Sequence, residues 1–71
     1  MAIDVNSVKP GDKVHYINPY NGKAENGIIK KRTINNTDYI FVVYHWNNTP
    51  EKFMYYTAEL TPIGHLYPGW L

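Results

Sequence analysis

Side chains that could carry out catalysis are few and far apart in this sequence. Ser7 is the only serine, and it follows an N-terminal stretch that we expect to be loose, so a Ser-His-Asp triad has no basis. The carboxylates fall in separate turns or on polar strand faces, with no pair on one predicted element. They are Asp4, Asp12, Glu25, Asp38, Glu51 and Glu59. This arrangement predicts a protein that is not an enzyme.

The histidines, His15, His45 and His65, belong to three different predicted elements. None has a second histidine two or four positions away, the spacing that places two ligands on one strand or helix face. We therefore expect solvated or hydrogen-bonded histidines and no metal site. The glycines form no phosphate-binding loop of the Walker or dinucleotide type, so we also expect no cofactor.

The composition describes a small domain. The chain has 71 residues, of which 44% are hydrophobic and 15% aromatic, and its formal net charge is +1. We expect one domain over residues 1–71, with residues 1–6 loose. The absence of cysteine excludes thiol catalysis, cysteine-ligated zinc and disulfides. Because no apolar run approaches the length of about 20 residues that spans a membrane, and residues 1–5 lack a signal-peptide pattern, we expect a cytoplasmic protein without a membrane partner.

Turn-forming residues recur at regular intervals, and short runs rich in Val, Ile, Tyr, Phe and Thr lie between them. The turns are Lys9–Asp12, Asn18–Gly22, Asn35–Asp38, Asn47–Pro50 and Tyr67–Gly69. This spacing is typical of a small all-β sandwich or barrel.

The first two runs predict strands of different character. Lys13–Ile17 alternates, with Val14 and Tyr16 on one face and polar residues on the other. Gly27–Ile34 cannot direct its three isoleucines to one face with a strict period of two. We therefore expect a bulge in this second strand, or one exposed isoleucine.

The third run, Tyr39–Trp46, is apolar on both faces. One face carries Tyr39, Phe41 and Val43, and the other carries Ile40, Val42, Tyr44 and Trp46. Only one face can belong to the core of so small a domain. We expect the chain's own tail, a second subunit or a ligand to cover the other face.

The rest of the chain continues with strand signals at Phe53–Tyr55 and Tyr56–Leu60. Thr61–Leu66 predicts one short helical turn, with Thr61 as its N-cap and Pro62 at its first position. Trp70 carries an indole that is costly to leave in water, so we expect it to fold back onto the domain.

Val8–Val14 followed by Gly27–Ile29 resembles the opening of small SH3-like barrels of the KOW and Tudor type, in which a Pro-Gly-Asp turn leads into the first strand and a glycine opens the second. This resemblance covers the first half of the chain. It implies an all-β, five-stranded SH3-like barrel with one short 3-10 turn near the C-terminus.

The second half resembles short proteins carried by bacteriophages and prophages. The residues that carry this resemblance are Phe41–Tyr44, Tyr56–Ala58 and Leu66–Trp70. Those proteins bring no established activity, so the resemblance implies a genomic setting and no mechanism.

In a barrel that resembles Tudor domains, the loop with Tyr16 and Tyr20 would face the loop after the third strand, with Tyr44, Trp46 and Asn47. The resemblance thus implies several aromatic faces at one rim. Such a rim could stack a nucleobase or cage a cationic side chain by cation–π attraction. The alternative is that these rings form the core and subunit contacts.

Lys30–Arg32 is the only run of charge in the chain. Lys31 or Arg32 could bind a phosphate group, or the run could form a solvated strand face. A net charge of +1 lies far below the basic excess expected of a nucleic-acid binder.

Our leading expectation is a non-catalytic, homo-oligomeric binding module. It would be a phage-type accessory protein that blocks a host process, with antiviral defence as one candidate, by sequestering a nucleotide-type ligand. The predicted ligand-binding residues are Tyr16, Tyr20, Lys31, Arg32, Tyr44, Trp46 and Asn47.

Two alternatives stay open. An inhibitor or adaptor of a host protein would dock through Ile40, Val42 and Trp46, or through the opposite face of that strand. Further interface residues, toward a partner or a second copy, are Tyr55, Tyr56 and Trp70. An RNA- or DNA-binding barrel would instead use Lys30–Arg32, with an affinity that falls steeply with salt.

Overall fold

The computed structural model describes residues 2–71 as one antiparallel sheet with short 3-10 helices. The elements are β1 (Lys13–Ile17), β2 (Ala24–Arg32), β3 (Tyr39–Val43), η1 (Pro50–Tyr55), β4 (Glu59–Pro62), η2 (Ile63–His65) and β5 (Leu66–Pro68). The strand order is β4-β3-β2-β1-β5. The expected all-β class, with five strands and a short 3-10 turn near the C-terminus, is confirmed.

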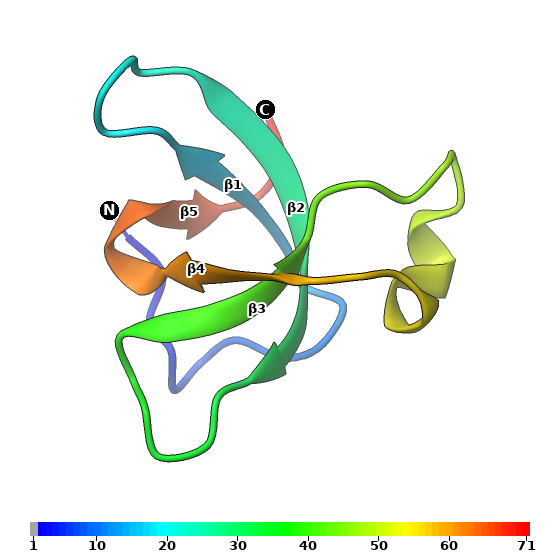
Figure 1. Cartoon of the computed structure of the whole chain (residues 1–71), viewed down its shortest axis with the longest axis horizontal. Coiled ribbons are helices and arrows are strands. Elements are labelled where there is room, and N and C mark those ends of the chain that lie inside the picture. The colour runs from blue at the N-terminus through cyan, green and yellow to red at the C-terminus, as the bar shows by residue number, and fades with distance from the viewer. Residues whose placement is uncertain (1) are drawn as a thin grey trace.

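The sheet curls strongly but stays open. β1 pairs with β2 and with β5, whereas β4 pairs with β3 alone among the described strands. Figure 1 shows the long β1–β2 hairpin at one side, β4 crossing in front, and the segment around η1 projecting away from the sheet. β4 and β5 are therefore the two edges, in an arrangement consistent with a small β-barrel-like fold.

The core fills the concave side of the sheet. Its fully buried residues come from all the strands except β4, and they are Val14, Ile29, Ile40, Val42 and Leu66. Ile3, from the stretch that we expected to be loose, also belongs to this cluster, as does Val8. The amide of Ile3 donates to the carbonyl of Leu66 at 2.9 Å, which fixes the segment across β5. The expectation for Met1 lies outside the described residues.

Both arrangements that we expected for the isoleucines of the run Gly27–Ile34 occur, a bulge and an exposed isoleucine. The register with β3 shifts between Ile29 and Lys31, which marks a bulge. Ile28 and Ile29 are both buried, on opposite faces, while Ile34 lies beyond the strand and is 90% exposed. The sheet therefore buries an apolar residue on each face at this point.

The chain itself covers much of the convex face. Val43 pairs with Ile28 there, and both are buried although neither belongs to the main core cluster. η1 packs against β2, and the Lys30 ammonium donates to the carbonyl of Tyr56 at 2.6 Å. We expected the chain's own tail, a second subunit or a ligand to cover the second face of Tyr39–Trp46. Later segments of the chain itself cover part of that face.

Several predicted element bounds are wrong. β3 ends at Val43 instead of Trp46, and Phe53–Tyr55 belongs to η1 instead of a strand. The reason is local: Asn47 and Asn48 adopt positive φ values of 46° and 66°, and Pro50 begins a 3-10 helix. Such a turn followed by proline stops strand pairing.

The bounds at the end of the chain shift as well. Tyr56–Ala58 lies outside the sheet, and β4 begins at Glu59. Thr61 and Pro62 belong to β4 instead of starting the helical turn, so Pro62 is the residue before η2 and Thr61 is no cap. Proline is tolerated here because β4 is an edge strand, where a missing N–H breaks no ladder bond.

The expected return of Trp70 onto the domain is confirmed. Its Nε1 donates to the carbonyl of Gly27 at 2.7 Å, and the amide of Gly69 donates to the carbonyl of Lys13 at 2.8 Å. Asn26 and Leu71 exchange hydrogen bonds of 2.9 and 3.2 Å. The C-terminal tail, residues 69–71, therefore runs along the convex face of β1 and β2.

Candidate functional site

A groove at the concave side of the sheet brings aromatic rings and carboxylates together. It encloses about 280 Å³ and is lined by Tyr16, Glu25, Tyr44, Glu59, Leu60, Thr61 and Pro62. Strand alternation sets this lining, because residues an even number of positions apart in a strand lie on the same face. Tyr16 lies two residues from the core residue Val14 in β1, and Glu25 lies four residues from the core residue Ile29 in β2. Glu59 lies two residues from the buried Thr61 in β4. The same periodicity that builds the core thus aims these side chains at one place.

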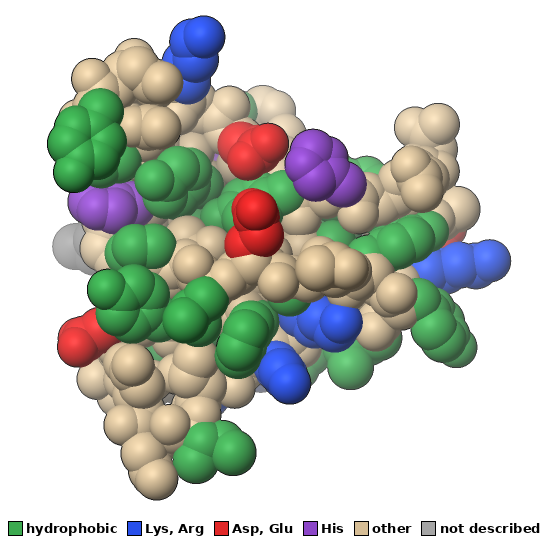
Figure 2. All heavy atoms as spheres, viewed as in Figure 1, with side chains coloured by type: hydrophobic (Ala, Val, Ile, Leu, Met, Phe, Trp, Pro, Cys, Tyr) green, Lys and Arg blue, Asp and Glu red, His purple; other side chains and the backbone are tan. Residues whose placement is uncertain are grey.

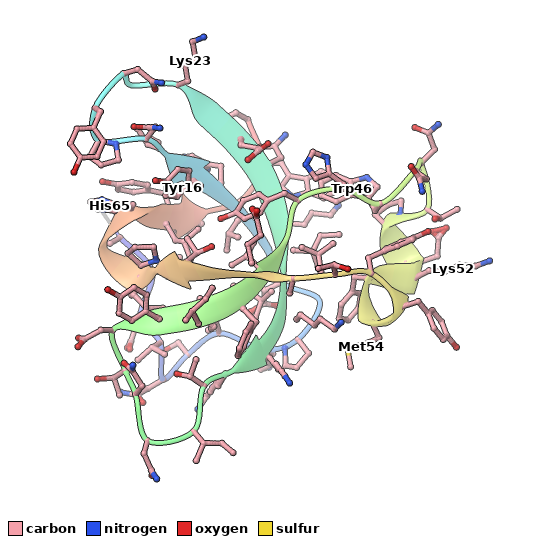
Figure 3. The ribbon with its side chains drawn as sticks, viewed as in Figure 1. Tyr16, Lys23, Trp46, Lys52, Met54 and His65 are labelled. Carbon is pink, nitrogen blue, oxygen red and sulfur yellow. The ribbon has the colours of Figure 1, made fainter. Side chains whose placement is uncertain are left out.

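Tyr16 stands between two other rings. Its ring meets Tyr44 edge to face, with 6.3 Å between centroids and 74° between planes, and meets His65 at 6.2 Å and 85°. Figure 3 shows Tyr16 and His65 close together where β1 approaches η2. Edge-to-face packing on both sides holds the Tyr16 ring in one orientation.

Tyr44 forms the floor of the groove. It is 9% exposed, and its hydroxyl bonds to the Thr61 hydroxyl at 2.9 Å. Thr61 in turn donates to the carbonyl of Glu59 at 3.2 Å. Burial raises the pKa of Tyr44 to about 12, and the negative charges of Glu25 and Glu59 add to that rise against the opposing Thr61 hydrogen bond. The phenol is therefore neutral at neutral pH.

The charge of the groove is negative. Both glutamates are exposed at the rim, and none of the lining residues is Lys or Arg. In Figure 2 two red carboxylates lie near the middle of the viewed face, with green apolar side chains and a purple histidine beside them. Neutral aromatic rings beside carboxylates attract an organic cation and repel a phosphate.

Two further hollows of similar volume extend the groove along the sheet. One shares Tyr16 and Glu25 and continues to Asn18, Asn21 and Lys23 in the β1–β2 loop. The other shares Tyr44 and Glu59, and it continues to His45, Tyr56 and Thr57. The acidic and aromatic residues are therefore the centre of a longer surface.

A separate, larger hollow of about 460 Å³ lies between the N-terminal segment and β1. Its walls include Ile3, Val8 and Val14. The rim carboxylates of Asp4 and Asp12 already accept hydrogen bonds from residues close in sequence. With its polar groups engaged, this hollow offers apolar contact without a converging recognition group.

The aromatic residues predicted to form one rim lie at three different parts of the structure. Tyr16 and Tyr44 meet at the groove, as the resemblance implied, but Tyr20 is 96% exposed at the tip of the β1–β2 loop. Trp46 stacks on Trp70 at the convex face, and Asn47 forms the turn before η1. Figure 3 shows Trp46 where the chain leaves β3, far across the view from Tyr16.

The predicted phosphate-binding cations lie elsewhere again. The Lys31 ammonium sits 5.1 Å from the centroid of the Phe41 ring. The Arg32 guanidinium donates to the carbonyls of Asn6 and Val8, at 3.3 and 3.0 Å. The described chain therefore does not bring these cations together with Tyr16 and Trp46, because they lie at the end of β2 beyond the bulge. A phosphate site between subunits stays a prediction.

The predicted interface residues differ in how far they are exposed. Ile40 and Val42 are fully buried in the core, so the expectation that they contact a partner is wrong. The opposite face, which we had kept as the alternative, leaves Tyr39 40% exposed and Phe41 half-buried. Tyr55 is 86% exposed, while Tyr56 and Trp70 are half-buried by contacts within the chain.

Sequence reasoning missed Glu25 and Glu59 as a pair. They lie on strands at positions that both face the concave side, yet they are far apart in the sequence and on strands that do not pair with each other. Glu25 is followed two residues later by Gly27 and four residues later by Ile29, a core residue. That spacing was the one available signal that Glu25 shares the core-side face.

Residues 2–71 contain neither a metal-binding cluster nor a membrane-spanning helix. No group of at least three His, Asp or Glu side chains is arranged to hold a metal ion in that range. No helix in the same range has both the length and the apolarity to span a bilayer.

The comparisons with known proteins identify no relative. No protein-family model matches the chain, and neither the curated proteins nor the solved structures yielded a significant match.

Proposed function

We propose that this protein is a non-catalytic binding module that holds a cationic side chain, lysine or arginine, of a partner protein in the concave groove. The observation that carries this proposal is the meeting of Tyr16 and Tyr44 with Glu25 and Glu59, without a cation in the lining. It combines two of the ligand classes that we considered from the sequence, a caged cation and a protein partner.

The physical basis is electrostatic. A Lys or Arg head over an aromatic face gains about 0.5–1 kcal/mol at an exposed site and more when it loses water. The two carboxylates add electrostatic attraction for the cation. The Tyr44 phenol is neutral and therefore does not repel it. The expected affinity for an isolated side chain is low, so neighbouring contacts of a partner must contribute.

A nucleotide at the groove is the weaker proposal. Its phosphates would face Glu25 and Glu59, while the predicted partners Lys31 and Arg32 contact Phe41 and backbone carbonyls. A planar ligand is better supported at the convex face as a second candidate function. There the Trp46–Trp70 stack lies beside Lys13, whose ammonium is 4.6 Å from the Trp70 centroid.

The strand order with a 3-10 turn before the last strand supports an SH3-like assignment of this open sheet. We keep that assignment as part of the proposal. The phage-type setting, a host target and a homo-oligomeric state also stay proposals, and native mass spectrometry of the purified protein tests the last of them.

The test is an NMR titration with small probes. N-acetyl-lysine methylamide and N-acetyl-arginine methylamide should shift the amide signals of Tyr16, Glu25 and Glu59, and the uncharged norleucine analogue should not. Glu59→Gln should weaken binding of the cationic probes about threefold to tenfold. The control is Glu51→Gln, an exposed carboxylate in η1 outside the groove, which should bind as the unmodified protein does.

Equal binding of the norleucine analogue would contradict the proposal. So would a Glu59→Gln variant that binds the cationic probes with unchanged affinity. For the second candidate, quenching of tryptophan fluorescence by mononucleotides should be lost in Trp46→Ala, and its persistence would remove the convex face from consideration.

A further inference from the structure

The free edge of β4 separates the acidic groove from an apolar patch, and this placement restricts the partner further. The side chains of Glu59 and Thr61 lie on the core-side face of the strand and those of Leu60 and Pro62 on its other face, and all four residues line the groove where it meets this edge. Across the ladder, Leu60 pairs with Phe41 and Pro62 pairs with Tyr39. We call the residues on that convex side, Tyr39, Phe41, Leu60 and Pro62, the edge patch.

The edge patch is exposed and apolar. Leu60 is 52% exposed and Tyr39 is 40% exposed, although both lie in regular strands. The Lys31 ammonium contacts it through the Phe41 ring, 5.1 Å from the ring centroid. Figure 2 shows green side chains gathered over β3 and β4 below the red carboxylates of the groove.

The ladder geometry identifies which backbone groups of β4 are free. The amide of Ile63 donates to the carbonyl of Asp38 at 2.9 Å, in register with the β3–β4 pairs. Because antiparallel pairs alternate between bonded and non-bonded, Ile40–Thr61 and Val42–Glu59 are the bonded pairs. The N–H and C=O of Leu60 therefore point away from β3, toward the open edge.

Pro62 limits pairing at this edge to one position. Its nitrogen also points away from β3 by the same alternation, but it carries no hydrogen. An added strand can thus exchange a full pair of hydrogen bonds only with Leu60. This restriction sets the register of any strand that pairs there, since a shift by one residue would move every side chain to the other face.

We propose that β4 accepts an extended segment of the partner protein with the pattern basic, apolar, basic. This inference rests on the proposed function and specifies its backbone mode. The apolar residue lies opposite Leu60 and contacts the edge patch, and the residues before and after it lie on the groove side, opposite Thr61 and Glu59. Charge complementarity selects this occupant, because the groove side of the edge is acidic and the patch side is apolar.

Synthetic peptides test the pairing without altering the fold of the protein. A short peptide with lysine, leucine and lysine at its centre should bind, and one with leucine, lysine and leucine should bind at least about tenfold more weakly. N-methylation of the central leucine removes a hydrogen bond to Leu60 and should also weaken binding about tenfold or more. N-methylation of an adjacent lysine, whose N–H points away from β4, is the matched control and should have little effect.

A protein variant and an exchange measurement give independent readouts. Leu60→Ala should weaken binding about fivefold or more, whereas Met54→Ala, at a side chain of 54% exposure on η1, should not. Binding of the peptide should slow amide hydrogen exchange at Leu60 and leave Thr61 nearly unchanged, because the Thr61 amide already bonds to β3.

Outcomes separate this inference from the function on which it rests. If both N-methylated peptides bind equally well but Glu59→Gln still weakens binding, edge pairing is wrong and the cation groove stands. If Glu59→Gln leaves peptide binding unchanged and the norleucine probe binds as well as the cationic probes, the proposed function is wrong, and so is this inference, which rests on it. Protection at Leu60 together with the leucine-specific loss supports the pairing.

Discussion

The indole rings of Trp46 and Trp70 lie parallel, with 5.0 Å between their centroids and 2° between their planes. Trp46 opens the segment that carries η1, and Trp70 belongs to the C-terminal tail, so one stacking contact joins two segments outside the sheet. Trp70 also donates to the Gly27 carbonyl of β2 at 2.7 Å. The pair therefore holds both segments on the convex face of the sheet.

Truncation of Trp70 should loosen this arrangement. Trp70→Ala removes the stack on Trp46, the Lys13 contact and the hydrogen bond to Gly27, and we expect a loss of about 2–3 kcal/mol in the free energy of unfolding. Urea unfolding followed by circular dichroism measures the change. Tyr20→Ala, at a side chain that is 96% exposed, should change stability by less than about 0.5 kcal/mol. Equal effects of the two substitutions would contradict the role of the stack.

Gly27 lies where two core side chains cross β2 closely. A Cβ at this position would stand 2.5 Å from Cγ1 of Val42 and 3.1 Å from the Tyr44 ring. Gly27→Ala should therefore destabilise the protein by about 1–3 kcal/mol, because Val42 has no free space into which to move. Gly64→Ala is the matched control, since a Cβ there meets no atom within 4 Å and φ is not positive. Thermal unfolding of both variants should separate them, and an unchanged Gly27→Ala would show that the core yields at this point.

The buried hydroxyl of Tyr44 predicts a change of stability at alkaline pH. Its pKa is raised from 10.0 to about 12 in the folded protein, so the folded state keeps the proton that the unfolded chain releases first. The corresponding stability, about 2–3 kcal/mol, is fully present below pH 10 and is lost as the pH rises through about 12. Tyr44→Phe should show a smaller decline over this range while all other alkaline titrations remain.

Urea unfolding of both proteins at about pH 9 and about pH 11.5 gives the difference. Below pH 10 the Tyr44→Phe variant should itself be less stable by about 1 kcal/mol, because Thr61 loses one hydrogen-bond partner. Identical declines in the two proteins would place the Tyr44 phenol in contact with water in the folded state.

Arg32 should act as a positioning residue for the N-terminal segment, in contrast to the phosphate contact expected from the sequence. Arg32→Gln removes the charged donor to the carbonyls of Asn6 and Val8. We expect faster amide exchange at Ile3 and Val8 and a loss of about 1 kcal/mol. Lys31→Gln is the neighbouring control and should leave exchange in this segment unchanged. Unchanged exchange in Arg32→Gln would contradict the anchoring role.

The turn chemistry of the chain was readable from its residues. Gly11, Gly22 and Gly69 all adopt positive φ, as do Asn35, Asn47 and Asn48, and each falls in a stretch predicted as a turn. Local sterics decide such positions, because glycine and asparagine are the residues that tolerate this backbone conformation. Alternation likewise located β1 and the core role of Val14.

The sequence could not predict which face of β3 belongs to the core, because residues 39–46 are apolar on both faces. Its core face is defined by contacts with Leu66 and with Ile3, which lie at opposite ends of the chain. The other face is buried at Val43 by the segments held through Trp46 and Trp70, and it stays exposed at Tyr39. No local pattern distinguishes these two faces, because both satisfy a period of two.

The sequence by itself thus determined the all-β class, the turns and the return of Trp70, since these follow from backbone sterics, strand periodicity and the cost of exposing an indole. Only the tertiary structure decided the candidate site. Glu25 and Glu59 meet at Tyr44 because the strand order and the curl of the sheet bring β2 and β4 to one groove. The bulge after Ile29 placed Lys31 and Arg32 at the far end of β2. Long-range pairing and curvature, which no window of adjacent residues records, carry that information.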